Sequence, residues 1–233
     1  MHMNILLFDF DDTLISYDAA EEHGLTGALE EYGISPEPRL FEIYRRENRK
    51  LWRLIETGEI SSAELRIRRF ELLLEKGGIV TDVSAAQFSE TYLHYFSQSK
   101  QLEAGAREML EYLHGFPEIR KSIITNGFKD TQHQRIGVTE LEEFFEDIFI
   151  SDELGAKKPD PLIFDRALER LGNPAPESVL IIGDNLVSDI KGGKQYGLKT
   201  CWYNPAQADA GEYGQYIDYH IRHLKEIPQL LGV

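Results

Sequence analysis

The sequence is poor in cysteine and in positive charge. Cys201 is the only cysteine among 233 residues, so the chain can form no intramolecular disulfide, thiolate zinc site or CxxC redox pair. The 25 Lys and Arg residues are outnumbered by 40 Asp and Glu residues, which gives a formal net charge of −15. A field of this sign repels nucleic-acid duplexes and anionic membranes. We therefore expect no nucleic-acid polymer and no membrane as a partner, and the sequence indicates no obligate protein partner.

Long apolar runs are also missing. The longest early one, Ile5 to Phe8, meets Asp9 at once and has no basic region before it, so it predicts neither a signal peptide nor a membrane span. Together with the single cysteine, this indicates a cytoplasmic protein. The 42% of hydrophobic and 28% of charged residues are typical of an ordinary globular chain.

Five short apolar runs are typical of buried strands in a parallel sheet, because none alternates and each stops at a polar or turn residue. They are residues 4–8, 121–125, 147–151, 179–182 and 199–203. Helical patterns over residues 162–171 and 186–196 separate the later runs, and each ends at a glycine. This alternation predicts an α/β fold built on a doubly wound parallel sheet.

Residues 16–101 interrupt this alternation, because they show one helical pattern after another and no clear strand. At 86 residues the segment is far longer than an ordinary connection between a strand and a helix. It predicts a helical bundle inserted after the first strand. The expected domains are a discontinuous core, residues 1–15 and 102–233, and a helical insertion, residues 16–101.

Acidic residues follow two of the predicted strands. Asp9 and Asp11 are two positions apart, so an extended backbone directs both carboxylates to one side. Asp184 follows the fourth strand, and Asp189 falls in the first turn of the next helix. Carboxylate oxygens are the ligands that Mg²⁺ prefers. The simpler interpretations are a solvated acidic turn and an ordinary acid at a helix N-terminus, where negative charge is favourable.

Hydrogen-bond donors follow the second and third predicted strands. Thr125, Asn126 and Gly127 end the second strand, where a hydroxyl, an amide and free main-chain N–H groups can meet a phosphate. Lys158 precedes Pro159, which favours an extended conformation just before a helix begins. Ligands of doubly wound sheets bind at the carboxyl ends of the strands, where all these residues would lie. A common turn sequence and a solvated lysine are the alternatives.

In this order the segments resemble the four motifs of the haloacid dehalogenase-like (HAD) hydrolase superfamily. Asp9 to Thr13 is similar to the first motif, Thr125 to the second, Lys158 to the third, and Gly183-Asp184 with Asp189 to the fourth. The helical insertion resembles the first cap type of that superfamily. Further residues resemble its bacterial pyrimidine 5′-nucleotidase branch: Asn48, Leu51-Trp52, Glu56, Gly58, Arg69-Phe70, Ile124 to Gly127, Asp189 to Gly193 and Thr200 to Pro205.

The resemblance implies roles for these residues. Asp9 would be the nucleophile that forms an aspartyl-phosphate, and Asp11 would be the general acid and base. Mg²⁺ would be the cofactor. It would be held by Asp9, the main-chain carbonyl of Asp11 and Asp184, and Asp189 would orient these ligands from behind. Thr125, the Asn126 backbone and Lys158 would bind the phosphoryl group.

The implied function is Mg²⁺-dependent hydrolysis of a small phosphomonoester, with a pyrimidine nucleoside monophosphate as the expected substrate. A phosphatase of another small metabolite, such as a sugar phosphate, would share the whole phosphoryl site. A dehalogenase would share Asp9 but needs neither an acid at Asp11 nor a metal. A non-catalytic phospho-acceptor module would have no reason to carry the 86-residue insertion.

Overall fold

The computed structural model describes residues 3–56 and 58–233, and the chain forms two compact units. One unit comprises Met1–Tyr17 and Lys100–Val233, and the other comprises Asp18–Ser99. The boundaries expected from the sequence lie within two residues of these. Residues 1, 2 and 57 of the expected domain ranges lie outside the described residues. The functional assignment of the two units as a hydrolase core and a cap stays a prediction.

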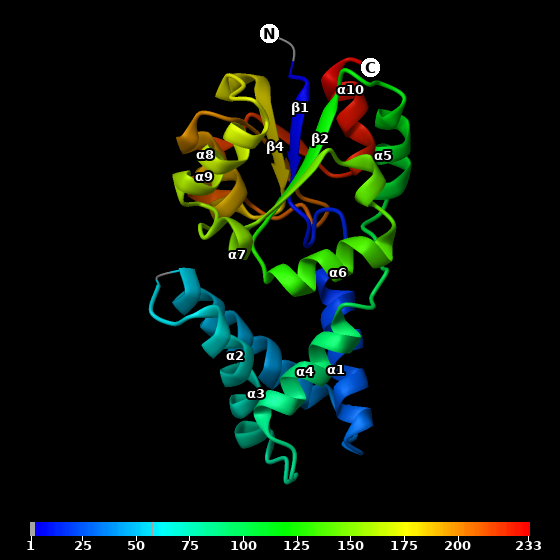
Figure 1. Cartoon of the computed structure of the whole chain (residues 1–233), viewed down its shortest axis with the longest axis vertical. Coiled ribbons are helices and arrows are strands. Elements are labelled where there is room, and N and C mark those ends of the chain that lie inside the picture. Colours follow the sequence, from blue (N-terminus) through cyan, green and yellow to red (C-terminus); the bar gives the residue numbers. More distant parts are fainter. Residues whose placement is uncertain (1–2, 57) are drawn as a thin grey trace. The chain divides into compact units, whose positions relative to one another are not determined.

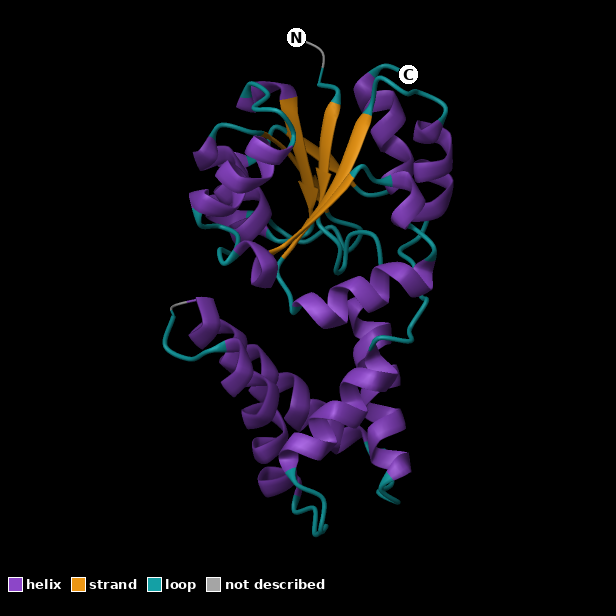
Figure 2. Ribbon diagram, viewed as in Figure 1, coloured by secondary structure: helices purple, strands orange, loops and turns teal. Residues whose placement is uncertain are grey.

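The first unit is built on a six-stranded, fully parallel sheet with helices on both of its faces (Figures 1 and 2). The strand order is β3-β2-β1-β4-β5-β6, so the chain moves outward from β1 first to one side and then to the other. This confirms the doubly wound α/β fold. The strands are β1 Ile5–Phe8, β2 Arg120–Thr125, β3 Asp147–Ile150, β4 Val179–Gly183, β5 Lys199–Tyr203 and β6 Tyr219–Ile221.

Alternate residues of β1 belong to different hydrophobic clusters, because successive side chains of a strand point to opposite faces. Leu6 and Phe8 pack in the cluster that includes residues of α5 (Ala106–His114) and α10 (Ile227–Leu231), whereas Ile5 and Leu7 pack in the cluster that includes residues of α8 (Pro161–Arg170). All four are buried, so β1 is the centre of the unit. The other helices are α6 Lys129–Thr139, α7 Ser151–Leu154 and α9 Gly192–Tyr196.

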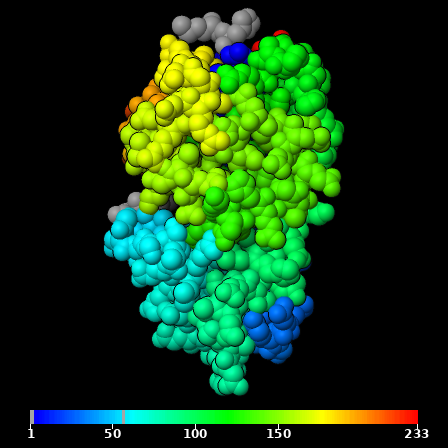
Figure 3. Space-filling view, viewed as in Figure 1, coloured from blue at the N-terminus to red at the C-terminus, as the bar shows by residue number. Residues whose placement is uncertain are grey.

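The five strands expected from the sequence are confirmed, with ends that differ by at most one residue. The helix expected over residues 186–196 begins as a π-helix, Leu186–Lys191, and continues as α9. The edge strand β6, which is only three residues long, was not expected, nor were α5 and α6. In the space-filling view, the visible face of this unit consists mainly of residues coloured green to yellow, from α5 to β4 (Figure 3).

The chain segments that lead to and from the helical insertion pair with each other within the core unit. Ile15 and Leu102 form an isolated antiparallel bridge. The Ser16 N–H donates to the Gln101 carbonyl at 2.9 Å, and the Glu103 N–H donates to the Leu14 carbonyl at 2.9 Å. The outgoing and returning chain segments are therefore fixed side by side.

Within the described part of the second unit, helices are the only regular elements, as expected. Its helices are α1 Tyr17–Glu31, which starts one residue earlier, α2 Pro38–Glu56, α3 Ser62–Gly77 and α4 Ala85–Phe96. Phe70 is fully buried, and its ring centroid lies 5.1 to 5.5 Å from those of Tyr44, Phe88 and Tyr92. An aromatic core thus joins α2, α3 and α4. No helix within the described residues is both long and apolar enough to cross a membrane.

Leu7→Ala should destabilise the protein strongly, because Leu7 is fully buried in the central strand. We expect the free energy of unfolding to fall by about 2–5 kcal/mol, the range for a leucine deleted from a packed core. Urea denaturation followed by circular dichroism measures this loss. Ile67→Ala is the control, because Ile67 is 41% exposed and should change stability by less than about 0.5 kcal/mol. Equal effects of the two substitutions would contradict the packing described here.

Candidate active site

The loop that follows β1 places Asp9 at the carboxyl edge of the sheet. The Asp9 N–H donates to the Ile182 carbonyl of β4 at 2.8 Å, and the Asp9 Oδ1 accepts from the Phe10 N–H at 2.8 Å. The chain then turns at Asp12, whose φ of 53° lies in the left-handed region. The Asp12 Oδ1 accepts from the Tyr17 N–H at 2.9 Å and stabilises this turn. Asp9 is thus fixed by main-chain contacts in a loop that begins at the central strand.

Lys158 is buried at the centre of the site, and its side chain is 1% exposed. The Nζ atom lies 2.8 Å from the Asp9 Oδ1, 2.7 Å from the Asp189 Oδ1 and 2.8 Å from the Ile124 carbonyl. The ammonium donates a hydrogen bond to the Ile124 carbonyl and forms ion pairs with the two carboxylates. Lys158 therefore connects the ends of β1, β2 and β4.

Asn126 holds the chain segment that carries Lys158. The Asn126 Nδ2 donates to the Lys158 carbonyl at 2.8 Å, and the Lys158 N–H donates to the Asn126 Oδ1 at 2.8 Å. Both ends of the amide are thus engaged by one residue. The Asn126 side chain therefore positions the lysine, and the phosphate-binding role expected for the Asn126 backbone stays a prediction.

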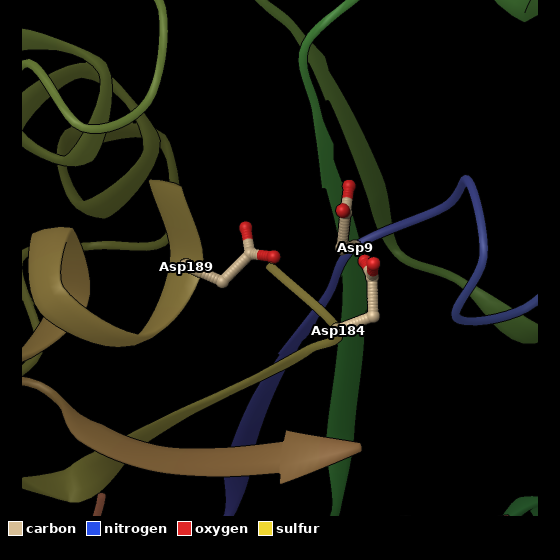
Figure 4. Close-up of side chains that lie close together, drawn as sticks. All are labelled: Asp9, Asp184 and Asp189. Carbon is tan, nitrogen blue, oxygen red and sulfur yellow. The ribbon is translucent and has the colours of Figure 1, made fainter. Parts of the chain in front are cut away.

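Three carboxylates come together beside Lys158. One oxygen of each of Asp9, Asp184 and Asp189 lies within 4.8 Å of the others (Figure 4). Asp189 projects from the π-helix toward the other two, and its Oδ2 also accepts from the Asn185 N–H at 3.1 Å. A Cβ atom at Gly183 would lie 2.3 Å from the Asp189 Oδ2. The approach of Asp189 to the end of β4 therefore requires a glycine there.

The electrostatics of the cluster are unbalanced, since three carboxylates face one ammonium. Burial, followed by the charge of Asp189, raises the pKa of Asp9 to about 8. Burial, followed by the charge of Asp9, raises the pKa of Asp184 to about 9. Burial by itself would lower the pKa of Lys158, but Asp189 and Asp9 raise it above its usual range. A further positive charge would stabilise the ionised carboxylates.

This set of donors fits Mg²⁺, which takes hard oxygen ligands. Asp9 and Asp184, two of the expected ligands, lie in the cluster together with Asp189. The Asp11 side chain points elsewhere: its Oδ1 lies 2.5 Å from the Arg135 Nη1, and its Oδ2 accepts from the Gln132 Nε2 at 2.9 Å. The metal-binding role expected for Asp11 concerns its main-chain carbonyl and stays a prediction.

The residues that the sequence did not indicate are Gln132 and Arg135, both on α6. Gln132 also donates from its Nε2 to the Thr125 Oγ1 at 2.9 Å, so it joins Thr125 to Asp11. Since Gln132 is the donor, the Thr125 hydroxyl can give its own hydrogen to a ligand. The signal available in the sequence was their spacing of three, which puts both residues on one face of a helix.

The motifs at these strand ends are those of a known family. The family profile of haloacid dehalogenase-like hydrolases matches residues 6–203. The chain belongs to this family. Its resemblance to the family, noted on the four motifs, is thereby confirmed.

Its relatives include phosphatases of two kinds. The HAD-hydrolase YfnB of Bacillus subtilis is 35% identical over 98% of this chain and 95% of its own. The pyrimidine 5′-nucleotidases PynA of Streptococcus pneumoniae and YjjG of Escherichia coli are 35% and 34% identical over 88% and 99% of this chain, and over 85% and 99% of their own. A glyceraldehyde 3-phosphate phosphatase of Pyrococcus furiosus is 33% identical over 99% of this chain and 92% of its own.

A crystal structure of YfnB bound to magnesium is similar to this chain along its whole length. The TM-score is 0.90 at 33% identity, and the match covers 100% of both chains. The hydrolase family and the similarity to pyrimidine 5′-nucleotidases are thus confirmed.

Asp184→Asn should stabilise the metal-free protein at pH 7.5. The pKa of Asp184 rises from 3.8 to about 9 on folding, so the native state binds more protons, and stability is lost as the pH rises through this window. Removing the charge should add at least about 1 kcal/mol, or about 2–4 °C in melting temperature. Melting curves in EDTA measure the shift.

The same curves in Mg²⁺ provide the complementary result, because a ligand of the native state stabilises it. Mg²⁺ should raise the melting temperature of the wild type and raise that of Asp184→Asn much less. The exposed Asp209 gives the control Asp209→Asn, which should respond to Mg²⁺ as the wild type does. Lower stability of Asp184→Asn in EDTA, together with a full response to Mg²⁺, would contradict the proposed cluster.

Proposed function

We propose that this chain is a Mg²⁺-dependent phosphomonoester hydrolase that acts through an aspartyl-phosphate on Asp9. The observation that carries the proposal is the contact of Asp9 with Lys158 in a cluster with Asp184 and Asp189. These residues meet where the strand order reverses beside β1, which is the usual binding position in doubly wound sheets. A charged phosphoryl group requires both a cation and an ammonium at such an acidic position.

In the first step the Asp9 carboxylate attacks phosphorus. Lys158 and the Phe10 N–H both bind the Asp9 Oδ1, so Oδ2 is the atom placed to form the new bond. The bond from phosphorus to the leaving oxygen breaks, and Asp11 gives its proton to that oxygen. Lys158, the Thr125 hydroxyl and the Asn126 backbone hold the phosphoryl oxygens while their charge redistributes.

In the second step water attacks phosphorus and displaces the Asp9 carboxylate. Asp11 now takes the proton of that water, so inorganic phosphate leaves and both carboxyl groups return to their starting states.

Asp9, the main-chain carbonyl of Asp11 and Asp184 would hold Mg²⁺, and Asp189 would orient them. The metal supplies positive charge that keeps Asp9 ionised and offsets the phosphate charge.

The substrate we propose is a pyrimidine nucleoside monophosphate. The proposal is supported by the similarity to PynA and YjjG along most of the chain. It is also supported by the residues of the helical unit that resemble the pyrimidine 5′-nucleotidase branch, namely Asn48, Leu51-Trp52, Glu56, Gly58 and Arg69-Phe70. The similarity to a glyceraldehyde 3-phosphate phosphatase favours a second candidate, a small phosphorylated metabolite without a base. Under either proposal the location is cytoplasmic, where the buried Cys201 would stay a free thiol.

Asp9→Asn should abolish phosphate release, because the amide cannot attack phosphorus. The fold should survive, since the Asp9 contacts with Ile182 and Phe10 use a main-chain N–H and an oxygen that Asn retains. A malachite-green assay on dUMP with Mg²⁺ should show a loss of at least about 10³-fold. Asp209→Asn serves as the control. Wild-type rates for purified Asp9→Asn would exclude Asp9 as the nucleophile.

The proposed substrate class is tested by a panel of phosphomonoesters. We expect kcat/KM for UMP, dUMP and dTMP to exceed that for glyceraldehyde 3-phosphate and hexose phosphates by at least about tenfold, which corresponds to about 1.4 kcal/mol of transition-state binding. Phosphate release is measured for each compound at the same Mg²⁺ concentration. A higher kcat/KM for the compounds without a base would refute the nucleotide as substrate and support the second candidate.

A further inference from the structure

A buried pair of polar side chains on α6 lies behind Asp11. Gln132 is 2% exposed and Arg135 is 1% exposed, although such side chains are usually found at the surface. The guanidinium carbon of Arg135 lies 5.4 Å from the centre of the Phe10 ring, and its Nη1 is 2.5 Å from the Asp11 Oδ1. The arginine is thus fixed by its stacking on Phe10 as well as by its charge.

The amide of Gln132 has a defined orientation. Its Nε2 donates to the Asp11 Oδ2 at 2.9 Å and to the Thr125 Oγ1 at 2.9 Å, whereas its Oε1 accepts from the Arg135 Nη1 at 3.0 Å. An amide flipped by 180° would place an acceptor against the carboxylate and a donor against the guanidinium. The amide therefore has a single favourable orientation. In it, Arg135 donates to Gln132, and Gln132 donates to both Thr125 and Asp11.

The loop after β2 is shaped to admit this side chain. A Cβ atom at Gly127 would lie 2.7 Å from the Gln132 Cγ and 2.9 Å from its Cδ and Nε2. The glycine that ends the Thr-Asn-Gly segment thus makes room for Gln132 to reach both Thr125 and Asp11.

We infer that Gln132 and Arg135 are positioning residues that fix the Asp11 carboxyl group for proton transfer and link it to the phosphate-binding Thr125. This inference rests on the proposed function. Each carboxylate oxygen of Asp11 has one donor from α6, and the Asp11 side chain is still 23% exposed. The group is therefore held in one orientation while remaining accessible to a leaving oxygen. Proton transfer needs this alignment, because its rate depends on the geometry of the hydrogen bond to the reacting group.

The test is the dependence of the rate on the leaving group. A phenolate with strong electron-withdrawing substituents can depart without a proton, whereas the alkoxide of a nucleoside cannot. Because kcat/KM reports the steps up to the first irreversible one, it isolates the transfer of the phosphoryl group to Asp9. We propose measuring kcat/KM for dUMP, phenyl phosphate and 4-nitrophenyl phosphate with the wild type, Arg135→Met, Gln132→Met and Arg135→Lys.

We expect Arg135→Met and Gln132→Met to lose about 10²-fold on dUMP and less than about fivefold on 4-nitrophenyl phosphate, within the range that general acid catalysis supplies. The loss should fall on kcat more than on KM. Arg135→Lys retains the charge and should recover at least part of the activity on dUMP. Should Arg135→Met fail to fold, Gln132→Met is judged by the same criterion.

The chain offers a matched control in Arg170. This arginine also pairs with an aspartate, Asp147, and lies over a phenylalanine ring, that of Phe149 at 5.0 Å, but it has no contact with the site residues. Arg170→Met should leave the leaving-group dependence unchanged.

A uniform loss on all three substrates, or no loss, would overturn the inference and leave Gln132 and Arg135 with a structural role. An inactive wild type would instead refute the proposed function, so the two failures are distinguishable.

Discussion

The buried ammonium of Lys158 is the group on which the geometry of the site depends. It contacts Asp9 after β1, the Ile124 carbonyl of β2 and Asp189 after β4. Without this charge, Asp9 and Asp189 would be two carboxylates facing each other in a buried environment, and their repulsion would be uncompensated. Asn126 holds the backbone of Lys158 through two hydrogen bonds, so the position of the ammonium is set by the loop of the neighbouring strand.

One ammonium does not neutralise three carboxylates, and burial together with this excess of negative charge raises the pKa values of Asp9 and Asp184. A cluster with balanced charges would fold at a lower electrostatic cost, but it would attract a metal cation less strongly. The same imbalance that opposes folding in the absence of a cation thus favours binding of one. The site is negatively charged, as is the whole chain with its net charge of −15. A phosphate can therefore approach the site only when additional positive charge is present.

The helix α6 shows why part of the site was not predictable from the sequence. Its buried positions are Thr131, Gln132, Arg135, Ile136 and Thr139, and four of these five are polar. Hydrophobic periodicity, the main signal for a helix, is therefore weak where a helix faces a polar site. Gln132 and Arg135 are buried because Asp11 and Thr125 supply their partners, and those partners lie far away in the sequence.

The sequence by itself determined the parallel sheet, the long helical insertion and the strand ends at which Asp9, Thr125 and Asp184 lie. These features follow from local patterns: apolar runs without alternation, glycines after helices, and polar residues directly after strands. Only the tertiary structure decided that the Asn126 side chain holds Lys158, that Asp189 approaches Gly183, and that Asp11 turns to α6. Those contacts join segments that lie far apart in the sequence, in the case of Asp11 and Arg135 by 124 residues. A local sequence pattern does not indicate which distant segments come into contact.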